Sequence, residues 1–420
     1  MRIGLKAVAC VLSATFCGVI LAQSPAPKAA ETAGEKPAEK PKPGPKYLNL
    51  RFDEDYSYLD EPEKAEKDFF DPIKNIRFGK DWRLSLGGEM RYRFEDRRDF
   101  DFNRKRVDHD SFNLTRVRMH ADLKFRQFAR LFVEGRDSRM GDEKRLTKRG
   151  SEDTFDIQNL FLDLKALGGN VPLTLRLGRQ ELSYGDERLI GSLDWGNVRR
   201  TFDGVKAIYD TKPVRVDIFW VRPVGTPRKD LNDADYSRSF RGAYATLKTI
   251  PNHALDVYAV QFKEETTSVT GGDGRRGDFE IETYGSRFVG TRKAFNFGAF
   301  DYGVEAAMQR GNWSHDDVDT WAIHTRGGYT FQKIPWTPRL GVEYNHASGD
   351  HNPRDDKFQT FHNLFPTNHD KYGYMDFVGW RNIDNWRFSL SAQPTPKLFL
   401  SLDYHLFHLD EERDALYNAG

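Results

Sequence analysis

The chain has 420 residues, with 64 Lys and Arg against 63 Asp and Glu, a net charge of +1 and 38% hydrophobic residues. Because so balanced a charge creates no strong long-range field, a strongly basic nucleic-acid binder and an acidic disordered tail are disfavoured. Beyond the N-terminus no stretch reaches the ~18 apolar residues of a membrane-spanning helix, which excludes a helical membrane protein.

The first residues predict export from the cytoplasm. Arg2 and Lys6 precede an apolar stretch from Ala7 to Leu21, and Ala22 offers a small residue for cleavage, so residues 1–22 form a predicted signal peptide. A membrane-anchoring helix is the alternative, but the apolar run is short for one and a Pro-rich stretch follows it.

A spacer follows the leader. Residues 23–46 alternate Pro, Ala, Lys and Glu, which have nothing to bury and predict a flexible linker. The two cysteines, Cys10 and Cys17, lie upstream of this linker, so disulfides cannot stabilise the mature chain. We expect residues 47–420 to form one large hydrogen-bonded domain.

A period of two dominates that domain. From Trp82 to Phe94 and again from Thr115 to Phe125, apolar side chains alternate strictly with polar or charged ones, as in strands with one oily face. About fifteen such segments occur between residues 82 and 408, each near the ~10 residues of a tilted membrane-spanning strand. Further examples are residues 173–177, 214–220, 300–309, 321–331, 339–345, 386–391 and 398–406.

Two architectures use such strands. A soluble sandwich buries the oily faces against each other, whereas an outer-membrane barrel turns them to lipid and its charged faces to water. Successive Arg and Glu on the polar faces, and aromatic residues near strand ends, favour the barrel. Short links at residues 167–170 and 211–213 and long links at 97–110, 139–153, 264–277 and 349–376 agree with it. We therefore predict an all-β, transmembrane antiparallel β-barrel in the bacterial outer membrane.

The chain also resembles a known family. Leu175 to Asp210 reads LRLGRQELSYGDERLIGSLDWGNVRRTFDGVKAIYD, and this stretch is similar to the alginate export family of outer-membrane porins. The likeness extends in order over residues 76–418, through LGGEMRYRFE, RVDIFWVRPV, PRLGVEYNHASGD, FHNLFPTNH and RDALYN.

The resemblance implies a function. Members are monomeric barrels of eighteen strands with an arginine-rich constriction that passes an anionic polysaccharide such as alginate, and they can act with periplasmic export partners. The family pattern continues past the RDALYN segment, whereas this chain ends at Gly420. We therefore expect the closing strands to be missing and the barrel to be truncated at its C-terminus.

Passive diffusion of a polyuronate needs fixed cations on the charged strand faces. Arginine suits this role because its planar guanidinium makes two-point contacts with carboxylates and stays charged. The alternative for each charged residue is a cross-strand pair that holds the wall together, and for Arg199 and Arg200 an ion pair with Asp194 or Asp203. The lumen candidates are Arg91, Arg93, Arg116, Arg118, Arg176, Arg199, Arg200, Arg215, Arg387, Glu89, Asp122, Asp217, Glu305 and Glu343.

No catalytic, cofactor or metal site is predicted. Gly272 to Gly277 matches GxGxxG, but a strand pattern follows it where a dinucleotide site needs a helix, so a loop is expected. An outer-membrane barrel enzyme is disfavoured because no converging nucleophile and base stand out. The alternative function is a general or substrate-specific porin for small anions or organic acids.

Overall fold

The computed structural model describes residues 11–13, 47–60, 68–98, 109–141, 151–166, 170–227, 230–294 and 297–418. The predicted signal peptide and linker lie outside these residues, apart from the three-residue strand β1 (Val11–Ser13). The chain divides into two compact parts. The N-terminal part comprises Glu35–Asp210 and Asp217–Phe240; the C-terminal part comprises Met1–Gly34, Thr211–Val216 and Arg241–Gly420.

The described residues hold 18 strands, and β1, β2 and β16 among them have three residues or fewer. The all-β fold and the estimate of about fifteen long strands are therefore confirmed. The remaining elements are η1 (Arg51–Asp53), η2 (Ser57–Asp60), α1 (Asp71–Lys74), β2 (Ile76–Phe78), β3 (Trp82–Arg98), β4 (His109–Phe125), β5 (Ala129–Gly141), β6 (Asp153–Lys165), β7 (Leu173–Gln180), β8 (Phe202–Asp210), β9 (Val214–Pro223), β10 (Arg238–Leu247), β11 (His253–Thr270), β12 (Arg276–Ala294), β13 (Gly298–Trp313), β14 (Asp316–Thr330), β15 (Arg339–Ala347), β16 (Lys357–Phe358), β17 (Ile383–Thr395) and β18 (Leu398–His408).

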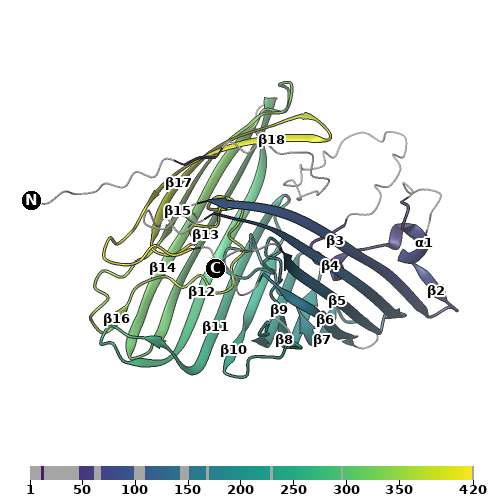
Figure 1. The fold of residues 1–420 in the computed structure, drawn as a ribbon. Coiled ribbons are helices and arrows are strands. Elements are labelled where there is room, and N and C mark those ends of the chain that lie inside the picture. Colours follow the sequence, from purple (N-terminus) through teal and green to yellow (C-terminus); the bar gives the residue numbers. More distant parts are fainter. Residues whose placement is uncertain are drawn as a thin grey trace, which may run out of the picture. The chain divides into compact units, whose positions relative to one another are not determined.

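Each part is an antiparallel meander (Figure 1). In the N-terminal part, β2 to β8 each pair with the next strand along the chain. In the C-terminal part, β11 to β14 each pair with the next strand, β15 pairs with β17 and β17 with β18, and the two-residue β16 pairs in parallel with β14. Antiparallel neighbours allow short connections, so strands adjacent in sequence are adjacent in the sheet. Among the described residues, no helix is long and apolar enough to cross a membrane.

Burial is inverted relative to a water-soluble protein. On β3 and β4 the apolar side chains Met90 and Met119 are 78% and 69% exposed, while Arg118 on the opposite face is 1% exposed. The same alternation occurs on β13 and β14, where Met308 and Trp321 are exposed and Gln309 is fully buried. Large exposed apolar areas mark surfaces that meet something other than water.

Aromatic rings gather at the strand ends that carry short turns. Trp82 at the start of β3 packs on Phe125 at the end of β4, with ring centroids 4.7 Å apart. Phe300 of β13 and Tyr329 of β14 make a similar pair at 4.6 Å. Aromatic side chains in this position are typical of a membrane–water boundary.

One predicted loop is wrong. Residues 264–277 were expected to form a long polar link, but β11 continues to Thr270 and β12 begins at Arg276. A tight turn joins them, closed by a hydrogen bond from the Gly271 amide to the Arg275 carbonyl. The hydrogen bonds between strands are made by backbone groups, so β11 and β12 can extend into polar residues that show no alternation of apolar side chains. The GxGxxG match falls on this turn and the start of β12, as the loop interpretation predicted.

Candidate functional site

A loop covers the charged face of the N-terminal part. Residues 181–201 join β7 to β8, and we call them the inner loop. The Asn197 side-chain amide donates to the carbonyls of Thr115 and Arg139, 3.1 and 3.2 Å away, which fixes the loop against β4 and β5. Ser138 of β5 donates in turn to the Asn197 carbonyl at 2.7 Å. The loop is therefore bound to the face on which the predicted arginines lie.

Two like charges face each other beneath the inner loop. Arg91 of β3 and Arg116 of β4 are direct partners in the sheet register, an arrangement that repulsion disfavours. Both donate to the Asp194 carbonyl, at 2.9 and 2.8 Å, and to the Gly196 carbonyl, at 2.8 and 2.9 Å. The loop's carbonyl oxygens thus offset the repulsion between the two guanidinium groups.

Arg93 lies beside them. It donates to the Trp195 carbonyl at 2.7 Å, and its guanidinium carbon lies 4.1 Å from the centroid of the Trp195 ring. The Trp195 side chain is 38% exposed. This is a cation–π contact at the edge of the inner loop, where an aromatic face and a cation are presented together.

Deeper under the loop, arginines and acids form a buried network. Arg118 donates to Glu134 at 2.9 Å and contacts Glu89 at 3.4 Å. Arg199 pairs with Glu181 at 2.5 Å and with Asp194. Because burying charges is costly, such groups persist only when they are paired, and here each cation has at least one carboxylate.

The pKa of Asp194 reflects this pairing. Burial would raise the pKa of this loop carboxyl, but Arg199 and Arg116 outweigh burial and hold it below its usual value. Arg199 is also fully buried, yet Glu181 and Asp194 raise its pKa above the ordinary value. Asp194 and Arg199 are therefore both ionised at neutral pH.

The structure brings together Arg91, Arg93, Arg116, Arg118, Arg199 and Glu89, and places the other candidates of the N-terminal part elsewhere. Arg176 faces Asp163 directly across β6 and β7 and makes a two-point contact at 2.7 and 2.9 Å. Asp122 accepts two bonds from Arg130, and Asp217 accepts from Tyr184 at 3.0 Å. Arg200 donates to the Gly191 carbonyl at 2.9 Å. The Arg176–Asp163 and Arg130–Asp122 contacts are cross-strand pairs of the kind given as the alternative, whereas Arg200 contacts a backbone carbonyl and Asp217 a tyrosine hydroxyl.

The remaining candidates belong to the C-terminal part. Arg387 of β17 pairs with Asp403 at 3.0 Å and approaches Glu343 at 3.9 Å. Glu305 is buried and accepts a hydrogen bond from Tyr258 at 3.0 Å. Arg215 is half-buried on β9.

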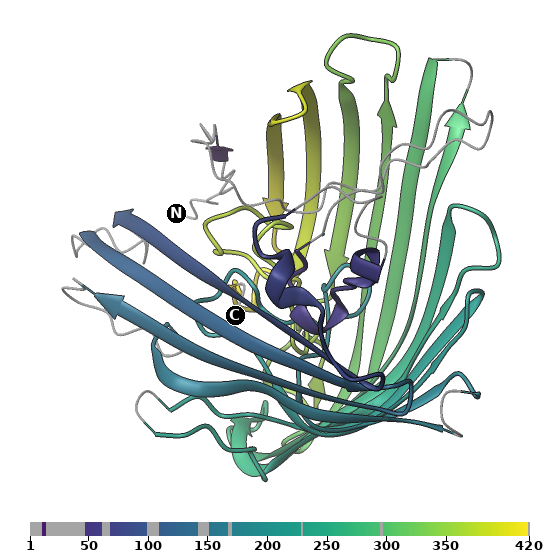
Figure 2. The same cartoon turned by 90° about the vertical axis from the view of Figure 1, so that its right-hand side faces the viewer.

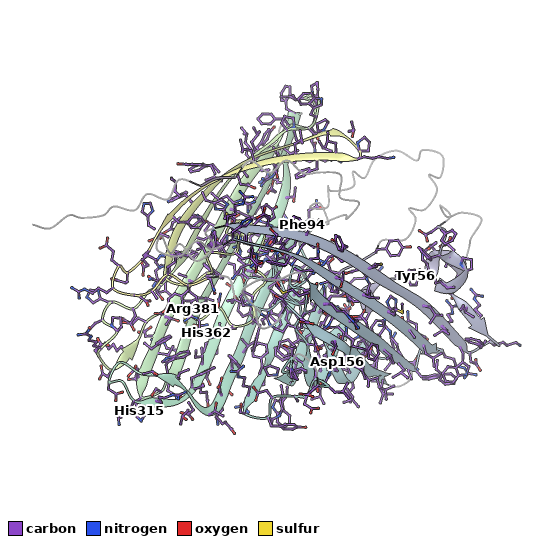
Figure 3. All side chains as sticks on the ribbon, in the orientation of Figure 1. Tyr56, Phe94, Asp156, His315, His362 and Arg381 are labelled. Carbon is purple, nitrogen blue, oxygen red and sulfur yellow. The ribbon has the colours of Figure 1, made fainter. Side chains whose placement is uncertain are left out.

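A second loop covers the charged face of the C-terminal part. Residues 348–382 join β15 to β17, and they contain β16. Gln309 of β13 donates to the His362 carbonyl at 2.6 Å and accepts from the His362 amide at 2.8 Å. Figure 3 labels His362 and Arg381, which both belong to this loop. The predicted long link at residues 349–376 is thus a structured loop that folds onto the strands.

Sequence reasoning missed several members of the buried network. Glu134 and Arg136 lie two residues apart on β5 and therefore share one face, which the period of two could have indicated. Glu181, and the N-terminal residues Asn49 and Arg51, carry no periodic signal because they lie outside the long strands. Asn49 accepts hydrogen bonds from Arg118 and Arg199 through its carbonyl oxygen.

One group among the described residues has the composition of a metal site. His346, Asp384 and Asp410 converge, with the His346 Nδ1 atom 3.1 and 3.7 Å from the two carboxylates. Other donors already hold both acids: Tyr344 donates to Asp384 at 2.6 Å and the Gly349 amide to Asp410 at 2.9 Å. Hydrogen bonds to protein groups account for this arrangement.

Comparison with known proteins places the chain. No curated protein matches it. The outer membrane protein OprD from Pseudomonas aeruginosa is similar with a TM-score of 0.51 and 10% identity, over 79% of this chain and 75% of that chain. OccAB1 from Acinetobacter baumannii is similar with a TM-score of 0.49 and 11% identity, over 76% of this chain and 77% of that chain. At such identities the likeness to OprD concerns the fold alone. The family described as alginate export matches residues 82–420, and the chain belongs to that family.

Proposed function

We propose that this protein is an anion-selective outer-membrane channel that passes an anionic polysaccharide, an alginate-like polyuronate or its oligomers, by passive diffusion along its charged strand faces. The observation that carries the proposal is the inverted burial of the strands, with apolar side chains exposed and ionised ones covered. Such an arrangement is stable where lipid meets the apolar side and water or polar protein meets the other.

The arginines supply the chemistry for an anionic sugar. Arg93 and Arg387 keep some exposure on the charged faces, and a guanidinium can exchange a protein acceptor for a solute carboxylate. The Trp195 ring beside Arg93 offers an apolar surface next to a cation, which suits a sugar ring that bears a carboxylate. Many weak contacts of this kind let a solute enter and leave again.

The proposal includes the route of assembly. Residues 1–22 direct the chain across the inner membrane and are cleaved, and residues 23–46 link the barrel to its N-terminus in the periplasm. The barrel acts as a monomer. Periplasmic export partners deliver the polymer.

A general or substrate-specific porin for small anions is the second candidate. The observation that favours it is the close matching of charges, since Glu89, Glu134, Glu181 and Asp194 neutralise most of the arginines under the inner loop. A face with few unpaired cations suits a small organic acid better than a long polyanion.

Planar-bilayer recording of the purified protein separates these functions. A salt gradient gives the ion selectivity, and uronate oligomers of increasing length, at a fixed carboxylate concentration, give the length dependence of current block. Block that strengthens with length supports the polysaccharide channel, whereas equal block by monomeric organic acids supports the small-anion porin. Cation selectivity, or no current from any folded form of the protein, would contradict both.

A further inference from the structure

An N-terminal segment occupies the charged face of the N-terminal part. Tyr47 to Asp60, which we call the N-terminal plug, contains η1 and η2. Phe52 of the plug packs edge to face on Phe132 of β5 and Phe161 of β6, with ring centroids 5.8 and 5.3 Å apart. Figure 2 shows the purple helical turns of this region beside the blue strands.

The two strand residues are unusual for their position. Phe132 alternates in phase with Glu134 and Arg136 on β5, and Phe161 alternates in phase with Asp163 on β6, so both rings lie on the charged face. All three rings of this cluster are buried. Aromatic rings on a face that only lines water would be exposed and would not stabilise the protein. On a face to which another aromatic side chain docks, they are buried and stabilise the contact.

The plug also occupies the arginines. The Asn49 carbonyl accepts from Arg118 at 3.4 Å and from Arg199 at 3.2 Å, and the Phe52 carbonyl accepts from Arg130 at 2.7 Å. A carboxylate oxygen of an anionic solute would need the same donors. The plug therefore competes directly with the anion for the arginines.

The plug has internal bonds and a defined attachment. Glu54 accepts from the Leu48 amide at 2.9 Å and from Arg51 at 2.8 Å, so the segment keeps its own folded turn. At its C-terminal end, Asp60 contacts Arg83 at 3.0 Å near the start of β3. The Phe52 cluster and the carbonyl contacts involve β4, β5, β6 and the inner loop, whereas Asp60 contacts β3, so the plug can leave the former while it stays attached.

We propose that the N-terminal plug is an autoinhibitory element: it closes the charged face in the resting protein and leaves the Phe132 and Phe161 rings when an anionic solute passes. The inference rests on the proposed channel function. The solute promotes opening because it binds the arginines only in the state from which the plug has left.

Single-channel recording of the mature chain tests this inference. Two variants release the plug, a deletion of residues 47–60 and Phe52→Asp, which places a charge among the three rings. Asp55→Asn is the matched control, because Asp55 is exposed and, among the residues that the structure describes, its hydrogen bonds go to Ser57 of the same segment. Heat-dependent mobility on gels shows whether each variant has folded.

The expected result is a several-fold rise in conductance or open time for both release variants, with the control like the wild type. A conducting wild type whose folded release variants behave identically overturns the plug and leaves the channel standing. Current from the release variants alone supports the plug. If no folded form conducts, the channel function fails and the plug fails with it. Should the deletion not fold, Phe52→Asp and the milder Phe52→Ala still decide the question.

Discussion

Met119→Arg tests the claim that the exposed apolar face meets lipid. Met119 lies on the exposed side of β4, between Thr115 and Phe125. At ~3.4 Å per residue the ten steps from Thr115 to Phe125 span about 34 Å along the strand. Tilted by ~45°, they cover about 25 Å, the height of the apolar band of an outer-membrane barrel. Met119 is near the middle of that span.

The magnitude follows from that depth. An arginine on the lipid face near the bilayer centre destabilises a folded barrel by ~2–4 kcal/mol. On a surface exposed to water the same change would cost no more than ~0.5 kcal/mol. The two environments therefore differ by a factor of at least ten in the folding equilibrium, since ~1.4 kcal/mol is one factor of ten.

Denaturant titration of the protein refolded in lipid vesicles measures the difference. Thr267→Arg is the control, because Thr267 is also exposed on a strand but lies in the polar extension of β11. We expect a loss of free energy of unfolding for Met119→Arg and almost none for Thr267→Arg. Equal, small effects in both variants would refute the assignment of this face to lipid.

Three further predictions concern the loops and the charged face. Glu181→Gln should lower the free energy of unfolding by ~3–5 kcal/mol, because it removes the fully buried carboxylate that pairs with the buried Arg199; chemical denaturation measures this, and a change below ~1 kcal/mol would contradict the buried network. Arg93→Gln should reduce anion selectivity in reversal-potential measurements while the folded fraction stays unchanged, and unaltered selectivity would remove Arg93 from the path. Burial, with the charge of Arg381 nearby, lowers the pKa of His362 to about 3, whereas an unfolded histidine titrates near ~6.5. Because the unfolded state then binds the proton first, stability should fall as pH drops from about 6.5 towards 3; His362→Gln should flatten this dependence in unfolding titrations, and an unchanged slope would exclude His362 as its source.

The strands could be predicted because their pattern repeats. From Trp82 to Phe94 each second residue is apolar, and the structure places those residues on one exposed face of β3. A period of two is a property of the backbone, since successive side chains point to opposite faces of any strand. The number of long strands and the all-β fold follow from counting these segments.

The covering segments could not be predicted in the same way. Residues 47–60 contain Asn49 and Phe52, whose contacts depend on the three-dimensional position of Arg118 and Phe132. Irregular segments have no period, so a sequence shows that they are polar or aromatic but not which face they cover. For the inner loop, the sequence did suggest the ion pair between Arg199 and Asp194, because these two residues lie close together along the chain.

The same segments determine which arginines can report on transport. Replacing Arg116 and Arg118 with acidic residues would be informative if these arginines lined a water-filled channel wall, but both are buried. Arg116 binds Glu89 and the inner loop, and Arg118 binds Glu89 and Glu134. Changing them would release the inner loop and leave buried carboxylates without their cations. An altered current would then report a rearranged protein and not a lost binding site. Arg93 makes its contacts at the loop edge, where removing the charge leaves Glu95 paired with Arg97. Selectivity in this chain is therefore best sought where cations remain partly exposed beside the loop, and stability where they are enclosed beneath it.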